Sequence, residues 1–114
     1  MKIPEYFPDH ELTCSCGCGL MPSAEFVRKL YIFRMLVNEP VYPTSVARCA
    51  TYNQEIGGSV GSYHLKGAAD VAITKEKEYS YIKAAQSAGM TGIGISDNKF
   101  MHLDDRETPA IWTY

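Results

Sequence analysis

The fold of this chain is decided by GSYHLKGAADVAIT, Gly61–Thr74, where a glycine-containing loop runs directly into a short apolar segment. Small and β-branched residues in this segment predict a strand over residues 68–74. Successive side chains of a strand point to opposite faces, so we expect Val71 to face the core and Asp70 to face away from it. A strand that presents a carboxylate on its open face indicates a site for chemistry as well as a structural element.

The rest of the chain supplies elements that would pack around this strand. Apolar residues at helical spacing, a cap at Ser23 and a closing glycine at position 89 predict two helices. The expected elements are a helix over 23–38, an extended segment over 41–50, a helix over 75–88, strands over 91–95 and 99–104 joined by a turn at 96–98, and an edge strand over 111–114. This order predicts an α+β fold with a small, mostly antiparallel sheet and helices packed on one face.

Length and composition indicate one domain, spanning residues 1–114, with an ordinary globular balance of 46% apolar and 21% charged residues. A net charge of −2 gives no reason to expect nucleic acid as a partner, and no apolar run predicts insertion into a membrane. The N-terminus lacks the apolar segment of a secretory signal, so we expect the protein to stay in the cytoplasm until it is released. We also expect it to be a monomer.

Four cysteines and one histidine receive no chemical role. Cys14, Cys16 and Cys18 lie in a CSCGC run and Cys49 stands alone. A tetrathiolate zinc site, a disulfide to Cys49 and unpaired thiols in a tight loop all remain open, although structural zinc ligands usually stand two to four residues apart. His10 is interpreted as an ordinary surface or core histidine.

A second polar cluster lies in FMHLDD, within the strand expected over 99–104. Residues two apart on a strand share a face, so His102 and Asp104 should project together. If this strand neighbours the one that carries Asp70, the three side chains converge, and His64 on the preceding loop can reach the same point. Two imidazoles and a carboxylate with an open position are typical of a catalytic zinc site.

These motifs resemble the zinc D-alanyl-D-alanine peptidases, peptidase family M15. The family includes D,D-carboxypeptidases, D,D-dipeptidases, peptidoglycan endopeptidases and phage endolysins, and it shares its fold with the hedgehog signalling domain. The resemblance covers nearly the whole chain, most closely the compact phage and prophage members. It rests on Ser45–Arg48, Asn53, Gly57-Gly58, Ser62–Gly67, Ala69-Asp70, His102–Asp104, Arg106 and Ile111–Tyr114.

The resemblance implies one zinc ion held by His64, Asp70 and His102, which activates water for attack on the scissile carbonyl. It makes Arg48 the group that binds a substrate carboxylate or carbonyl oxygen, a role that suits the forked donors of a guanidinium. Ser62 would brace the loop by a hydrogen bond. The aromatic side chains of Tyr52 and Tyr63 are expected to line the cleft.

Two features depart from the family pattern. His64 and Asp70 stand six residues apart where the family usually has seven, and Gly67 offers the backbone freedom to close a tighter loop. Many members carry a Glu or His base two or three residues before the last zinc ligand, where this chain has Lys99 and Phe100. Asp104 is therefore expected either to act as the general base or to orient the imidazole of His102.

The sequence thus predicts a small zinc metallopeptidase that hydrolyses peptidoglycan stem peptides or cross-links, as a D,D-carboxypeptidase or an endopeptidase of the endolysin type. The alternative is a non-catalytic zinc-binding module, such as a phage structural component that recognises cell-wall peptides. A third interpretation, a structural zinc protein built on the cysteines, also remains open.

Overall fold

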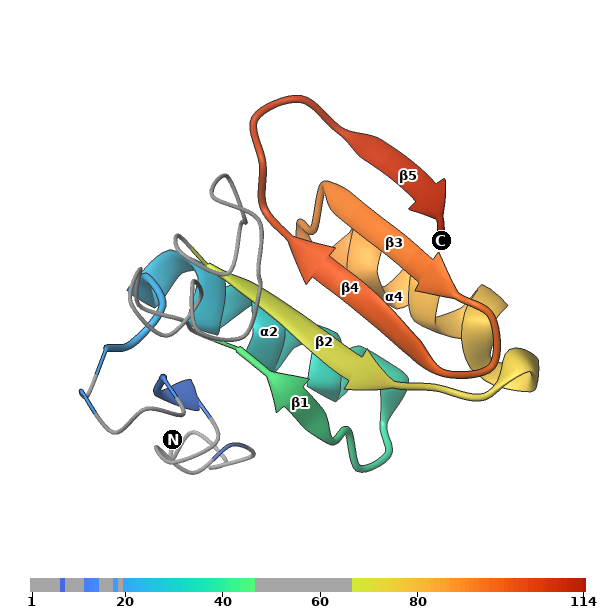
Figure 1. Cartoon of the computed structure of the whole chain (residues 1–114), viewed down its shortest axis with the longest axis horizontal. Coiled ribbons are helices and arrows are strands. Elements are labelled where there is room, and N and C mark those ends of the chain that lie inside the picture. The colour runs from blue at the N-terminus through green and yellow to red at the C-terminus, as the bar shows by residue number, and fades with distance from the viewer. Residues whose placement is uncertain (1–6, 8–11, 15–17, 19, 47–66) are drawn as a thin grey trace.

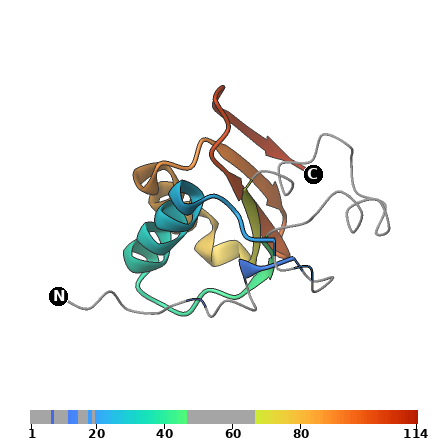
Figure 2. The same cartoon turned by 90° about the vertical axis from the view of Figure 1, so that its left-hand side faces the viewer.

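The computed structural model describes Phe7, residues 12–14, Cys18, residues 20–46 and residues 67–114. These residues form two layers, a twisted five-stranded sheet and a layer of two helices that covers one face of it (Figures 1 and 2). The second face of the sheet carries no helix among the described residues. The predicted α+β fold with a mostly antiparallel sheet and helices on one face is confirmed.

The elements follow the predicted order along the chain. They are α2 (Ala24–Val37), β1 (Pro43–Ser45), β2 (Ala68–Ala72), the 3-10 turn η2 (Lys75–Lys77), α4 (Glu78–Ala88), β3 (Gly92–Ser96), β4 (Phe100–Asp104) and β5 (Ala110–Thr113). Strand order in the sheet is β1-β2-β4-β3-β5. All pairings are antiparallel except that of β5 with β3, which is parallel.

The helix predicted over 23–38 is α2, and the predicted end residues Ser23 and Asn38 are its N-cap and C-cap. The hydroxyl of Ser23 accepts a hydrogen bond from the backbone N–H of Phe26 at 3.1 Å, which satisfies one of the free donors of the first turn. Asn38 adopts the left-handed conformation that commonly follows a helix. The buried face of α2 carries Phe26, Leu30 and Phe33.

The second helical region differs in detail from the single helix predicted over 75–88. It begins as η2, and the α-helix proper starts at Glu78 and ends at Ala88, where it is capped by Gly89 with the left-handed angle φ +99°. Tyr81 on α4 packs edge-to-face against Phe33 of α2, with ring centroids 5.5 Å apart. The two helices are thereby joined into one layer.

The sheet buries one side of each central strand against these helices. Val71 of β2, Ile93 of β3, and Met101 and Leu103 of β4 are at most 1% exposed and belong to the main apolar cluster. Their neighbours along each strand therefore face the opposite side, which we call the open face because no helix among the described residues covers it. In the extended segment predicted over 41–50, the strand is β1, and residues 47–50 lie outside the described part of the chain.

Gly67 fixes how the chain enters β2. Its φ is +156°, an angle that residues with a side chain rarely adopt, and a Cβ placed on it would lie 3.2 Å from the Cβ of Phe26. Phe26 itself is fully buried. The start of the strand that carries Asp70 is thus set by direct contact of a glycine backbone with α2.

We therefore expect Gly67→Ala to lower the free energy of unfolding by about 1–3 kcal/mol, because it adds backbone strain and crowds Phe26. Chemical denaturation followed by circular dichroism measures this change. Ser87→Ala, on the exposed side of α4, is the matched control and should change stability by less than about 0.5 kcal/mol. Equal stability of the two variants would contradict the proposed role of Gly67.

Candidate metal centre

The pairing of β2 with β4 brings a carboxylate and an imidazole together on the open face of the sheet. Asp70 lies directly opposite His102 in the register of the two strands. Nδ1 of His102 is 3.2 Å from Oδ1 of Asp70. Both side chains come from strand interiors, so their positions are set by the sheet rather than by a loop.

The other ring nitrogen of His102 contacts a second carboxylate, which lies deeper in the protein. Nε2 of His102 is 2.7 Å from Oδ2 of Asp104, two residues further along β4. Exposure of the side chain falls from 23% for Asp70 to 9% for His102 and to zero for Asp104. The arrangement is a row of three groups with one solvent-facing end and one buried end.

Arg106 occupies the buried end of the row. Its backbone N–H and its Nε–H donate to Oδ1 of Asp104 at 3.1 and 2.9 Å, and its Nη2 donates to Oδ2 at 2.6 Å. With the contact to His102, the carboxylate makes four hydrogen bonds. A carboxylate offers about four acceptor positions, so those of Asp104 are filled.

These contacts change the acidity of both partners. Burial acts to raise the pKa of Asp104, but hydrogen bonds from Arg106 and His102 outweigh burial and hold the pKa well below its usual range. Burial acts to lower the pKa of His102, but hydrogen bonds with Asp104 and Asp70, and the charges of both carboxylates, raise it. Asp104 is therefore ionised, and because it can only accept, Nε2 of His102 must carry a hydrogen.

Trp112 of β5 closes the side of the cluster. The ring centroid of Trp112 is 4.5 Å from the guanidinium carbon of Arg106 and 5.4 Å from the imidazole centroid of His102. Two glycines of β3 leave the necessary space. A Cβ on Gly94 would lie 2.6 Å from the indole ring, and a Cβ on Gly92 would overlap the carboxylate of Asp104.

The structure places only part of the predicted site. Within the described residues, no three His, Cys, Asp or Glu side chains form a group that could hold a metal ion, because Asp104 lies behind the imidazole rather than beside Asp70. The other predicted site residues, Arg48, Ser62, Tyr63 and His64, lie outside the described part of the chain, as does Tyr52.

Two members of the cluster had no role assigned from sequence. Arg106 and Trp112 were recognised only as parts of the family resemblance. The spacing Asp104-x-Arg106 is a signal for the first, because a side chain two residues on can turn back to the carboxylate. The contact of Trp112 depends on the parallel pairing of β5, which carries no local sequence signal.

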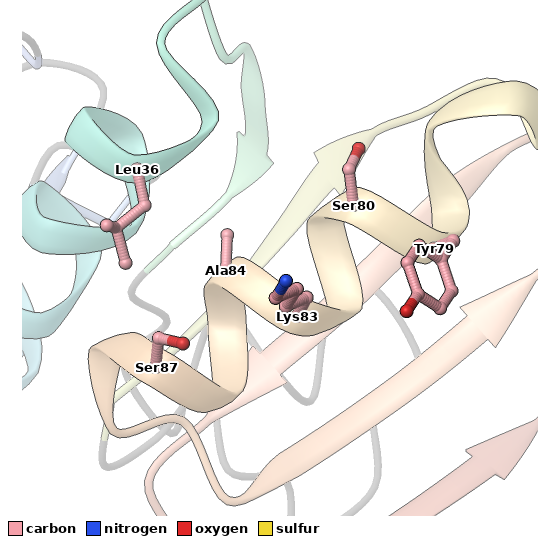
Figure 3. Close-up of a pocket in the computed structure, with 6 residues that line it drawn as sticks. All are labelled: Leu36, Tyr79, Ser80, Lys83, Ala84 and Ser87. Atoms are coloured by element: carbon pink, nitrogen blue, oxygen red, sulfur yellow. The ribbon is translucent and has the colours of Figure 1, made fainter.

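A hollow lies on the helical side of the molecule, away from the Asp70–His102 pair. It is a groove of about 360 Å³ between α2 and α4, lined by Leu36, Tyr79, Ser80, Lys83, Ala84 and Ser87 (Figure 3). The sheet separates this groove from Asp70 and His102, so it has no part in the candidate centre. No helix in the described ranges is long and apolar enough to cross a membrane.

The fold and the cluster define an α+β protein with a carboxylate–imidazole pair on an open sheet face. The family model described as Peptidase M15 matches residues 5–104, which include both helices, strands β1 to β4 and the whole Asp70–His102–Asp104 row. The chain belongs to this family, and is accordingly a hydrolase of the metallopeptidase class that acts on a peptide substrate. A search of curated proteins gave no significant match.

The metal-free protein should show the linked charges of the row in its pH dependence. Folding lowers the pKa of Asp104, so its contribution to stability is present above the ordinary value of 3.8 and is lost as pH falls below it. Folding raises the pKa of His102, so that contribution is present below the ordinary value of 6.5 and is lost as pH rises through the raised pKa.

We therefore expect Asp104→Asn to destabilise the protein by about 3 kcal/mol between pH 4 and 6.5, and by less on either side of this window. Urea unfolding at a series of pH values, in the presence of a chelator, measures the difference. Asp97→Asn removes an exposed carboxylate that is 3.9 Å from Lys75 and is the control. A loss for Asp104→Asn that does not vary with pH would contradict this account.

Proposed function

We propose that this chain is a zinc-dependent peptidase of peptidoglycan, with one zinc ion held by Asp70, His102 and His64. The substrate is a stem peptide or a peptide cross-link, cleaved by a D,D-carboxypeptidase or endopeptidase reaction. When bound, zinc would polarise the scissile carbonyl and activate a water molecule.

The observation that carries the proposal is the contact between Asp70 and His102. With hydrogen on Nε2, neutral His102 presents a lone pair at Nδ1, 3.2 Å from a carboxylate oxygen. Two acceptors at this separation repel unless a proton or a cation joins them. A carboxylate and a neutral imidazole are both ligands that zinc prefers, and the pair lies at the solvent-facing end of the row.

The third ligand is assigned by the sequence around Gly67. His64 precedes this residue by three positions, and Gly67 leads directly into β2. In the same way, Arg48 follows Ser45 by three positions, and Ser45 pairs with Asp70. Both assignments rest on the family pattern together with these short chain distances, and both are open to direct mutation.

Of the two roles expected for Asp104, the contacts favour orientation of the ligand. Its carboxylate is fully buried, its four acceptor positions are filled, and its pKa is held low. A general base needs a free position within reach of the water that it deprotonates. A carboxylate that accepts from the far nitrogen of a metal-binding histidine is a recurrent arrangement that fixes the ring and its tautomer.

Arg48 is proposed to bind the substrate carboxylate or the carbonyl oxygen, with Ser62 bracing the loop and Tyr63 lining the cleft. A guanidinium suits this role because its donors pair with two oxygens at once. By resemblance to the compact phage and prophage members of the family, we propose an enzyme of the lysis type, which remains cytoplasmic until released to the cell wall.

A non-catalytic zinc-binding module is the second candidate. It is favoured by the spacing of six residues between His64 and Asp70 and by the filled acceptor positions of Asp104. Such a module would bind zinc and cell-wall peptides without releasing amines. Hydrolysis of peptidoglycan by the purified protein therefore separates the two candidates.

We expect the purified protein to release free amines from peptidoglycan, and a chelator to abolish the release. His102→Ala and Asp70→Asn should each lower the rate at least about 100-fold, because each removes a metal ligand. His64→Ala should do the same. Mass spectrometry of the released fragments identifies the bond that is cleaved.

His10→Ala is the matched control, because it removes the one histidine outside the proposed site and should leave the rate within about twofold. Zinc bound at one equivalent without any release of amines would contradict the catalytic proposal and favour the binding module. Equal activity of His10→Ala and His64→Ala would remove His64 from the site.

The cysteines provide an independent test. Cys14 is buried, Cys18 is exposed, and Cys16 and Cys49 lie outside the described residues. A variant with all four cysteines changed to serine should retain one zinc ion per chain in metal analysis. Loss of zinc from this variant, with His102→Ala still loaded, would instead support the structural zinc site.

A further inference from the structure

We propose that Arg106 and Trp112 are positioning residues that hold Asp104, and through it the imidazole of His102, in the one orientation that presents Nδ1 to a metal ion. The inference rests on the proposed function in taking Nδ1 as the metal-facing atom. It assigns roles to two residues that are not themselves proposed as ligands: Arg106 contacts Asp104, and Trp112 packs on Arg106 and His102.

The grip of Arg106 on Asp104 goes beyond a single ion pair. Three donors of one residue reach both oxygens of the carboxylate, at 2.6 to 3.1 Å. Two donors on the guanidinium fork, Nε and Nη2, fix the plane of the carboxylate, and the backbone N–H fixes its distance from the chain. The carbonyl of Arg106 in turn accepts a hydrogen bond from the hydroxyl of Thr91, which anchors the backbone at this point.

Trp112 packs against the guanidinium of Arg106. Its ring lies 4.5 Å from the guanidinium carbon and is near enough to the imidazole to limit its rotation, with centroids 5.4 Å apart. Trp112 pairs with Gly94 across the parallel strands, and the absence of a side chain on Gly94 lets the indole lie against the sheet. One aromatic ring thus packs on both partners of Asp104.

The consequence for His102 follows from the geometry of an imidazole. A half-turn about the Cβ–Cγ bond would exchange Nδ1 for a carbon atom and withdraw the ligand. The hydrogen bond from Nε2 to Asp104 at 2.7 Å opposes that turn and also fixes the hydrogen on Nε2. If Asp104 can swing, the ring samples both orientations and both tautomers, and only a fraction of molecules can bind metal.

The test measures the tautomer of the His102 ring and the affinity for zinc in separate experiments. In the metal-free protein, at a pH where the imidazole is neutral, nitrogen NMR of labelled histidine reports which ring nitrogen of His102 carries hydrogen. Zinc affinity is measured separately by competition with a chromophoric chelator. The first variant is Arg106→Lys, which keeps the charge but loses the forked pair of donors. The other two are Trp112→Phe, which keeps an aromatic ring, and Trp112→Leu, which removes it.

Arg106→Lys and Trp112→Leu should each show a mixture of tautomers and bind zinc about 10- to 100-fold more weakly, whereas Trp112→Phe should stay closer to the wild type. Arg28→Lys and Ile111→Ala are the controls. Arg28 is exposed and pairs with Glu25, and Ile111 is an exposed neighbour of Trp112 on β5, so both should match the wild type. Circular dichroism identifies the variants that are folded. If Arg106→Lys does not fold, the two Trp112 variants still test the proposal.

A single Nε2–H tautomer with zinc affinity within twofold of the wild type in Arg106→Lys and Trp112→Leu would overturn the proposal. Weaker zinc binding with an unchanged tautomer would also overturn it, because these residues would then act by another route. The wild-type protein could hold one tautomer that the variants lose and yet itself neither bind zinc nor hydrolyse peptidoglycan. In that case the positioning role stands and the proposed function fails.

Discussion

The antiparallel pairing of β2 with β4 is the constraint on which the open face depends. It sets Asp70 opposite His102 and, because side chains alternate along a strand, sends Val71 and Met101 to the core at the same time. A slip by one residue would carry the carboxylate into the apolar layer and an apolar side chain to the open face. The apolar core and the polar row therefore require the same register. The packing that stabilises the core also fixes the positions of Asp70 and His102.

Much of this arrangement could be predicted from the sequence because it depends on local rules. The alternation in AADVAI and FMHLDD predicts which side chains share a face, and the cap at Ser23 and the glycine at position 89 predict the helix boundaries. The convergence of Asp70 with His102 needed one further assumption, that the two strands are neighbours, and the sheet confirms it.

The rest of the cluster depends on contacts that no local pattern encodes. Trp112 reaches the cluster because β5 pairs in parallel with β3, a long-range choice that sequence periodicity leaves open. For Arg106 the spacing of two residues from Asp104 is a weak local signal, but its three hydrogen bonds to the carboxylate also require the chain to turn back immediately after β4. Burial of Asp104 also emerged only in three dimensions, and it is the property on which we base our preference between the two roles expected for this residue.

The close fit of Trp112 over Gly94 has an evolutionary consequence. While the indole is in place, no residue with a side chain can occupy position 94 without moving the ring or the strand. If the indole were lost first, an alanine at 94 would no longer collide with it, and the return of tryptophan would then be opposed by that alanine. Changes at the two positions are thus order-dependent, and such a lineage would have a one-way path away from this form of the site.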